Sequence, residues 1–281
     1  MRLVSFEAGP GPRAALLRDG RVYDIWGEAF AHVRGEDRTV YALLQGGLLP
    51  EVEAIEEEGV PVEGVQLLPP IARPGKVICM GLNYRSHAEE AGLETPETPT
   101  FFAKFANAVA PPGATVRLPP WSEKVDYEAE VAFVVGAHCK DVPVERAMDF
   151  VAGYMLLNDI SARDYQFKTP QWMPGKVFDG SAPCGPALVT TDEAGPHDAV
   201  ELELRLNGEL MQKASTADLV HSVPQLLAYL STLMTLEPGD VVATGTPAGV
   251  GSVREPRVWL KPGDRIEISS PQLGVLETTI A

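Results

Sequence analysis

The amino-acid sequence predicts a mostly β protein with a mixed α+β architecture. Many short segments alternate apolar and polar residues, as strands with one buried face do. Asp-Gly and Asn-Gly pairs, which suit tight hairpin turns, lie between such segments. Few segments show helical spacing. We therefore expect a mixed sheet accompanied by few helices.

The N-terminal elements begin with a predicted hairpin over residues 14–25, because Asp19-Gly20 suits a type I′ turn. Two helical patches are expected next, near residues 38–44 and 51–58. The second patch is mostly acidic and is typical of a solvated surface.

A proline-rich stretch, residues 68–75, interrupts any regular element and precedes a buried-type strand at residues 76–81. We place a domain boundary at this stretch. Residues 1–70 are then expected to form a small N-terminal α/β domain, and residues 71–281 the main domain.

The main domain is predicted to contain one clear helix among several strands. Ser222 is the expected N-cap, Pro224 lies in the first turn, and leucines follow at helical spacing. The Asn207-Gly208 pair predicts a second hairpin. The expected strands after residue 81 are 125–136, 153–159, 200–206, 209–211, 241–244 and 265–269.

Composition limits the class of protein and its partners. A chain of 281 residues with 45% hydrophobic content can bury a large core, and a cytoplasmic location is expected because no long apolar segment is present. The formal net charge of −16 argues against nucleic acid or an anionic membrane as a partner. A bound cation would reconcile this charge with an anionic small-molecule substrate.

Three acidic residues form the strongest candidate site. Glu128 and Glu130 are one residue apart in a predicted strand, so their side chains point to the same face. Asp159 ends another apolar run. All-oxygen ligands favour Mg²⁺, Mn²⁺ or Ca²⁺, and three carboxylates would leave open positions for water or substrate. The alternative is the solvated face of an edge strand.

A candidate general base lies at His87. Ser86 and Glu89 match a capping box, which predicts that a helix begins at Ser86. His87 and Glu90 would then share one helix face, where the carboxylate can orient the imidazole. The alternative is a surface helix with incidental charges.

Two further segments bear on the substrate. Lys176 lies between a Pro-Gly turn and an apolar pair, where it could stabilise an enolate or simply face solvent. The glycine-rich loop 244–251 follows a buried strand and offers backbone N–H groups for a carboxylate. Neither the phosphate-loop pattern nor the G-x-G-x-x-G spacing is present, so nucleotide binding has no support.

Taken together, six motifs resemble those of the fumarylacetoacetate hydrolase family. They span residues 71–281 in the family's order, and as a set they are specific although each alone is weak. The motifs are residues 81–84 with His87 and Glu90, 101–104, 126–130, 158–164, 175–179 and 244–247.

The resemblance implies a catalytic β-roll domain of the family's own fold, paired as a homodimer. It implies Mg²⁺ or Mn²⁺, with Ca²⁺ as a substitute, held by the three acids named above. His87 and Glu90 would form a catalytic dyad on a lid, with Lys176 as the electrostatic partner. Substrate contacts are expected from Tyr84, Arg163, Gln166 and Thr246.

The reaction type stays open at this point. A 2-oxo acid could chelate the cation through its carboxylate and 2-oxygen. Hydrolysis of a C–C bond in a 2,4-dioxo acid by a His-activated water is the first expectation, because His87 and Glu90 are both present. The alternatives are isomerisation or decarboxylation of 2-hydroxy-dienoate diacids of aromatic catabolism or of oxaloacetate, and a metal-binding member without efficient turnover.

Overall fold

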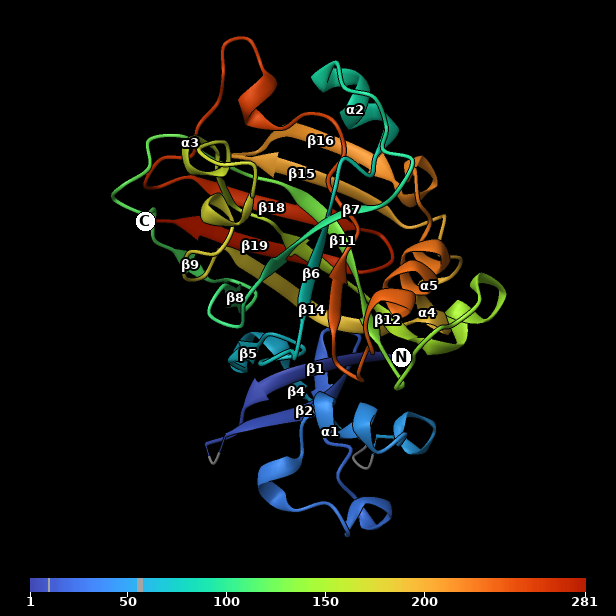
Figure 1. Ribbon diagram of the computed structural model, residues 1–281. Helices are drawn as coiled ribbons and strands as arrows, with labels where there is room; N and C mark the ends of the chain where they lie inside the picture. Colours follow the sequence, from blue (N-terminus) through green and yellow to red (C-terminus); the bar gives the residue numbers. More distant parts are fainter. Residues whose placement is uncertain (10, 55–57) are drawn as a thin grey trace.

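Strands dominate the computed structural model, which describes residues 1–9, 11–54 and 58–281 (Figure 1). The largest sheet has twelve strands, and its main path runs in the order β4-β3-β2-β1-β14-β12-β11-β17-β6-β7. Two short strands lie off this path. The members are β1 (Arg2–Glu7), β2 (Pro12–Arg18), β3 (Arg21–Tyr23), β4 (Val60–Pro61), β5 (Leu67–Leu68), β6 (Val77–Gly81), β7 (Thr100–Lys104), β8 (Val109–Ala110), β11 (Ala129–Val135), β12 (Val151–Asn158), β14 (Ala182–Thr190) and β17 (Val241–Ala243).

A five-stranded sheet and a two-stranded ribbon complete the β structure. The five-stranded sheet contains β16 (Glu209–Ser215), β15 (Glu201–Leu206), β18 (Arg265–Ser270), β19 (Gly274–Ile280) and β9 (Thr115–Val116). The ribbon pairs β10 (Val125–Asp126) with β13 (Ser161–Ala162). The helices are α1 (Val40–Gln45), α2 (Arg85–Ala91), α3 (Arg163–Gln166), α4 (Thr191–Ala194) and α5 (Val223–Leu233). The mostly β prediction is confirmed.

The core has two parts, one on each face of the large sheet, because residues along β11 alternate between them. Val131 and Phe133 pack in the larger part with residues of α5 and the five-stranded sheet. Ala132 and Val134 pack in the smaller part with Trp26 and other N-terminal residues.

Both predicted hairpins are confirmed. The turn residues Asp19 and Gly20 have φ values of 50° and 69°, and Asn207 and Gly208 have 52° and 85°. Positive φ at both central positions is the requirement of a type I′ turn, which explains the Asp-Gly and Asn-Gly pairs.

The first of the two N-terminal helical patches and the helix after Ser222 are confirmed, whereas the acidic patch is not helical where it is described. α1 overlaps the first patch, and α5 starts after the Ser222 N-cap with a capping box to Gln225. The helix expected over residues 51–58 is wrong where the structure describes it. A three-residue 3-10 turn, Leu49–Glu51, ends there and residues 52–54 are irregular, while residues 55–57 lie outside the described residues. The patch is mostly acidic, so burial of a few apolar residues such as Val52 does not hold it in a helix.

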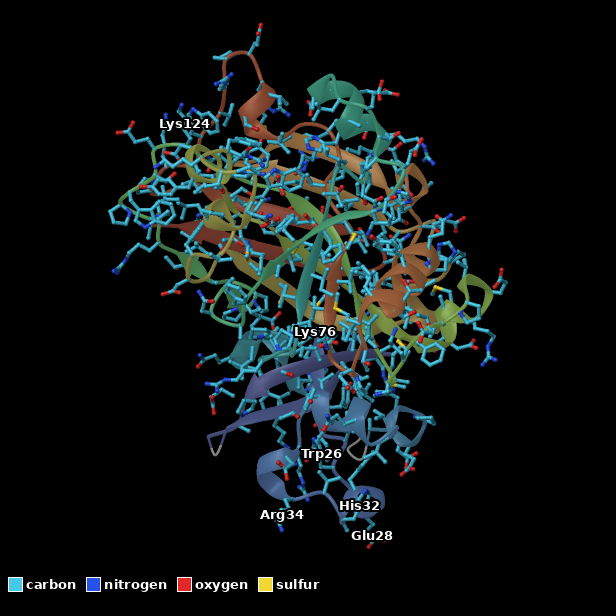
Figure 2. The ribbon with its side chains drawn as sticks, in the orientation of Figure 1. Trp26, Glu28, His32, Arg34, Lys76 and Lys124 are labelled. Atoms are coloured by element: carbon cyan, nitrogen blue, oxygen red, sulfur yellow. The ribbon has the colours of Figure 1, made fainter. Side chains whose placement is uncertain are left out.

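The N-terminal residues extend the large sheet rather than forming a sheet of their own, since β1 pairs with β14. Figure 2 shows Trp26 within the N-terminal part and Lys76 at its junction with the rest of the chain. Lys76 Nζ forms an ion pair with the buried Asp240 at 2.7 Å. Within the described residues, no helix is long and apolar enough to cross a membrane.

Candidate metal centre and active site

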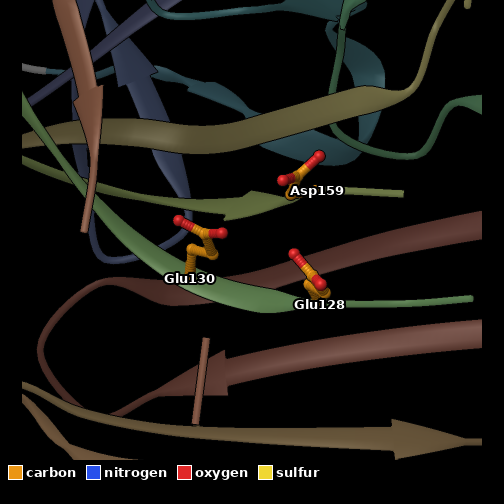
Figure 3. Close-up of side chains that lie close together, drawn as sticks. All are labelled: Glu128, Glu130 and Asp159. Carbon is orange, nitrogen blue, oxygen red and sulfur yellow. The ribbon is translucent and has the colours of Figure 1, made fainter. Parts of the chain in front are cut away.

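The three predicted acids converge in the protein interior (Figure 3). Glu128 immediately precedes β11, Glu130 lies in β11, and Asp159 immediately follows β12. One carboxylate oxygen from each lies within 4.8 Å of the others, and all three side chains are buried. β11 and β12 are neighbours in the sheet, with Ala129 opposite Asn158, and this register brings the acids together.

The strand expected over residues 125–136 is interrupted at Tyr127 and Glu128. The interruption follows from the buried Asp126 carboxylate, which accepts hydrogen bonds from the backbone N–H groups of Gly251 and Ser252 at 2.8 and 3.0 Å. These bonds hold β10 away from β11, in a ribbon with β13. The Glu128 side chain therefore projects from an irregular segment between two strands, not from a regular strand.

Three buried cations surround the acids. Lys176 Nζ donates to Glu128 Oε2 at 2.8 Å and to Asp159 Oδ2 at 2.7 Å. Arg163 Nη1 lies 2.6 Å from Glu128 Oε1. Lys104 Nζ donates to Asp159 Oδ1 at 2.6 Å.

Glu128 and Glu130 differ in their electrostatic surroundings. Burial would raise the pKa of Glu128, but the positive charges of Lys176 and Arg163 outweigh it and lower the pKa to about 2. Burial is the main cause that raises the pKa of Glu130 well above its usual range, and the negative charges of Asp159 and Glu128 add to it. Glu130 is thus the acid whose negative charge has the least compensation.

The residues fit a divalent ion. Glu130 Oε2 accepts a hydrogen bond from the Gly245 N–H at 2.8 Å, whereas Glu130 Oε1 is buried and has no hydrogen-bond partner among the described residues. A buried carboxylate oxygen without a partner is costly unless a cation sits beside it. Three carboxylates are the donor set that Mg²⁺ or Mn²⁺ prefers. The triad can therefore hold a hard divalent cation.

His87 and Glu90 lie on one face of α2, as expected, but the start of that helix differs from the prediction. Tyr84, not Ser86, is the N-cap residue, and Ser86 donates its hydroxyl and its N–H to Asp218 at 2.6 and 3.1 Å. Asp218 comes from a distant part of the chain, so the capping-box pattern alone could not locate the helix start.

The His87 imidazole lies next to the Glu90 carboxylate without a hydrogen bond between them. Nδ1 is 3.7 Å from Oε2, and it has no hydrogen-bond partner among the described residues. Burial lowers the pKa of His87 below its usual 6.5, which favours the neutral imidazole. The Glu90 carboxylate accepts the Gly249 N–H at 3.0 Å, which ties α2 to the glycine-rich loop.

The predicted substrate contacts separate into two groups. Gln166 and Thr246 line the pocket. Gln166 Oε1 accepts a hydrogen bond from Arg163, and Thr246 Oγ1 accepts one from Gln212. The Gln166 amide N–H groups and the Thr246 hydroxyl are left to donate to a substrate. Arg163 lines the pocket, but its guanidinium is held by Asp126 and Glu128. Tyr84 is fully buried in the larger core and does not line this pocket.

The pocket itself has a volume of about 140 Å³. Glu128, Lys176 and His87 line it together with Arg163, Gln166 and Thr246, and apolar and aromatic side chains such as Met80, Phe102 and Trp172 form much of the remaining wall. Sites for drug-sized ligands measure about 300 to 1,000 Å³, so this pocket suits a small metabolite.

Three supporting residues had no role in the sequence analysis. Lys104 and Asp126 lay inside the quoted motifs, and nothing in their spacing indicated their partners. Gln212 is buried, accepts the Ala129 N–H at 2.9 Å and donates to Thr246 Oγ1 at 2.9 Å. Gln212 directly follows the predicted strand 209–211, and nothing in the sequence indicated this contact.

Known proteins resemble this chain in sequence and in fold. Residues 76–281 match the family model described as fumarylacetoacetate (FAA) hydrolase C-terminal. The mitochondrial oxaloacetate tautomerase FAHD2B of Bos taurus is 39% identical over 288 residues, which cover 98% of this chain and 90% of that protein.

Two solved structures share the whole fold at 33% identity. Each match covers 100% of this chain and 99% of the other. The fumarylacetoacetate hydrolase of Exiguobacterium antarcticum has a TM-score of 0.87. The 5-carboxymethyl-2-hydroxymuconate delta-isomerase of Mycobacterium smegmatis has a TM-score of 0.80.

Proposed function

Because the chain belongs to the fumarylacetoacetate hydrolase family, we propose that it is a divalent-metal-dependent isomerase that interconverts the enol and keto forms of a short 2-oxo diacid, of which oxaloacetate is the type. The observation that carries the proposal is the buried acidic triad, whose member Glu128 lines a small pocket together with Lys176 and His87. The named relative that acts as an oxaloacetate tautomerase supports isomerisation over the hydrolysis expected first.

Glu128, Glu130 and Asp159 would hold Mg²⁺ or Mn²⁺. When bound, such an ion supplies positive charge that polarises the 2-oxo group of the substrate. The Gln166 amide and the Thr246 hydroxyl would donate to the substrate carboxylate and fix its orientation, as polar groups in small-molecule sites do.

The proton transfer would fall to His87. In the keto form its neutral imidazole would accept a proton from C3, and the electron pair of the C–H bond would move into a C2–C3 double bond. The Lys176 ammonium would stabilise the negative charge that develops on the 2-oxygen. Return of the proton to that oxygen gives the enol, so atoms and charge balance without any co-reactant.

A second candidate is hydrolysis of a C–C bond in a 2,4-dioxo acid. The position of His87 in the pocket beside Glu90 favours it, because a neutral imidazole can also take a proton from water. The hydrolase from Exiguobacterium antarcticum, which shares the fold, gives this candidate independent support.

Product analysis separates the candidates. The enzyme is incubated with enol oxaloacetate and with an acylpyruvate, and the loss of enol absorbance is followed together with pyruvate release. Isomerisation predicts faster enol loss from oxaloacetate without pyruvate. Pyruvate from the acylpyruvate would identify hydrolysis, and pyruvate from oxaloacetate would identify decarboxylation.

The metal requirement is tested in the same assay. Chelator is expected to abolish turnover and added Mg²⁺ or Mn²⁺ to restore it. Glu130→Gln should remove activity while the protein stays folded, and Glu123→Gln, an exposed glutamate nearby, is the matched control. Full activity in chelator or in Glu130→Gln would overturn the metal-dependent function.

A further inference from the structure

The geometry points to Trp172 as a residue that determines substrate specificity. Together with Phe102 it forms an aromatic wall, and this wall restricts the site to short 2-oxo acids. This inference rests on the proposed function, since it concerns the length of the substrate of the same site. Trp172 precedes Lys176 by four residues, and both line the pocket.

The aromatic wall begins directly beside the acidic triad. Lys176 Nζ, which contacts Glu128 and Asp159, lies 4.9 Å from the centroid of the Phe102 ring. The Trp172 ring meets Phe102 edge to face, with centroids 6.0 Å apart and an interplanar angle of 71°. Phe102 thus contacts the charged lysine on one side and the Trp172 ring on another.

The Trp172 ring packs against the end of β6 because Gly81 has no side chain to displace it. A Cβ atom at Gly81 would lie 2.1 Å from Trp172 Cζ3 and 2.8 Å from Cη2. Real Cβ atoms do not approach other atoms this closely, so the ring uses space that only glycine provides. The ring thus lies across the strand that forms the pocket wall.

The backbone around Trp172 fixes the ring relative to the charged centre. The Gly175 N–H donates to the Trp172 carbonyl at 3.0 Å, and the Lys176 N–H donates to the Met173 carbonyl at 2.9 Å. This single 3-10 turn links the tryptophan to the lysine that contacts two of the acids. A shift of the Trp172 backbone away from the pocket would therefore move the turn that places Lys176.

The chemistry of the wall opposes a long diacid. A substrate anchored at the triad and longer than the pocket would push its chain, and finally its second carboxylate, against the two rings. Burying a carboxylate without a donor is costly. The 140 Å³ pocket leaves room for a short acid on the polar side of the rings.

The test compares two diacids of different length on the intact protein. Enol oxaloacetate has four carbons, and 2-hydroxyhepta-2,4-diene-1,7-dioate has seven. We expect Trp172→Ala to raise the ratio of kcat/KM for the seven-carbon acid over the four-carbon acid at least about tenfold, the scale of pocket discrimination between chain lengths. Trp172→Phe keeps a ring and should shift the ratio less.

The matched control is Trp121→Ala. Trp121 is 42% exposed and does not line the pocket, and its ring centroid lies 4.2 Å from that of Tyr165. The ratio of kcat/KM values for the two acids should therefore not change. Should Trp172→Ala fail to fold, Trp172→Leu takes its place in the comparison.

The outcomes distinguish this inference from the function on which it rests. A ratio unchanged within about twofold in the folded Trp172 variants, with four-carbon activity retained, would overturn the aromatic wall and leave the proposed function standing. A wild-type protein that prefers the seven-carbon acid would also overturn the wall. A wild-type protein inactive on both acids would overturn the proposed function instead.

Discussion

Three buried cationic side chains contact oxygen atoms of the acidic triad. Of these, Lys104 had no predicted role. Its ammonium group donates to Asp159 Oδ1 at 2.6 Å and to the Lys176 carbonyl at 2.5 Å. One side chain thus orients a candidate metal ligand and fixes the backbone of the lysine beside it. We interpret Lys104 as a positioning residue.

Replacing Lys104 by methionine should therefore weaken metal binding about 10- to 100-fold, as the loss of residues that orient metal ligands commonly does. Titration calorimetry of Mn²⁺ into chelator-treated protein measures this without relying on turnover. Lys124→Met, at an exposed lysine labelled in Figure 2, is the control. Equal Mn²⁺ affinity in both variants would contradict the positioning role.

His87 should matter for proton transfer more than for substrate binding. We expect His87→Gln to lower kcat about 10²- to 10⁴-fold, the usual contribution of a general base, with a smaller change in KM. His138→Gln, whose side chain is 65% exposed, should leave both constants unchanged. Steady-state kinetics on enol oxaloacetate checks this, and a kcat near the wild-type value would rule out His87 as the base.

The sequence predicted the triad from local features, because a single residue separates Glu128 from Glu130 and Asp159 directly follows an apolar run. Lys104 could not be assigned in this way. Its partner Asp159 lies 55 residues away in the chain, and the contact exists only once β7 occupies the edge of the large sheet.

Among the elements, those specified by local chemistry were the most predictable. The two hairpins follow from turn residues that tolerate positive φ, and α5 follows from its capping box and leucine spacing. The break before β11 was missed because it depends on Asp126 accepting hydrogen bonds from Gly251 and Ser252, about 125 residues later in the chain. The start of α2 was missed for the same kind of reason.

Gly153, in β12, is a position where a larger residue would strain the packing of two strands. A Cβ atom there would lie 2.1 Å from the Val189 carbonyl oxygen, which belongs to the backbone of β14 and cannot move aside cheaply. Gly153→Ala should destabilise the fold by about 1–3 kcal/mol, the typical cost of overpacking.

Urea unfolding measures this effect as a lower midpoint. Gly64→Ala is the control, because a Cβ atom at Gly64 would have nothing within 4 Å. Similar midpoints for the two variants would show that β12 and β14 can separate without penalty.

For the whole molecule, the predicted boundary near residue 70 can be tested by truncation. Leu3, Trp26 and Leu43 pack in the smaller core with residues of β11 and β12, and β1 covers the edge of β14. Removing residues 1–70 should expose this apolar face and an unpaired strand edge. We expect the fragment 71–281 to aggregate or to unfold at lower urea than the full chain, and equal stability would instead support an independent domain.

The resemblance to the family also leads us to expect a homodimer. Light scattering on the purified chain should then give a mass near twice the 30.2 kDa of one copy. A mass near 30.2 kDa would contradict this expectation.

The central claim is that Glu128, Glu130 and Asp159 hold a divalent ion, and anomalous diffraction from crystals soaked in Mn²⁺ tests it most directly. We predict a single strong anomalous peak enclosed by the three carboxylates and next to Glu130 Oε1, with no such peak in crystals of Glu130→Gln. Soaked wild-type crystals without a peak there, with the acids still paired to Lys104, Lys176 and Arg163 alone, would contradict the claim.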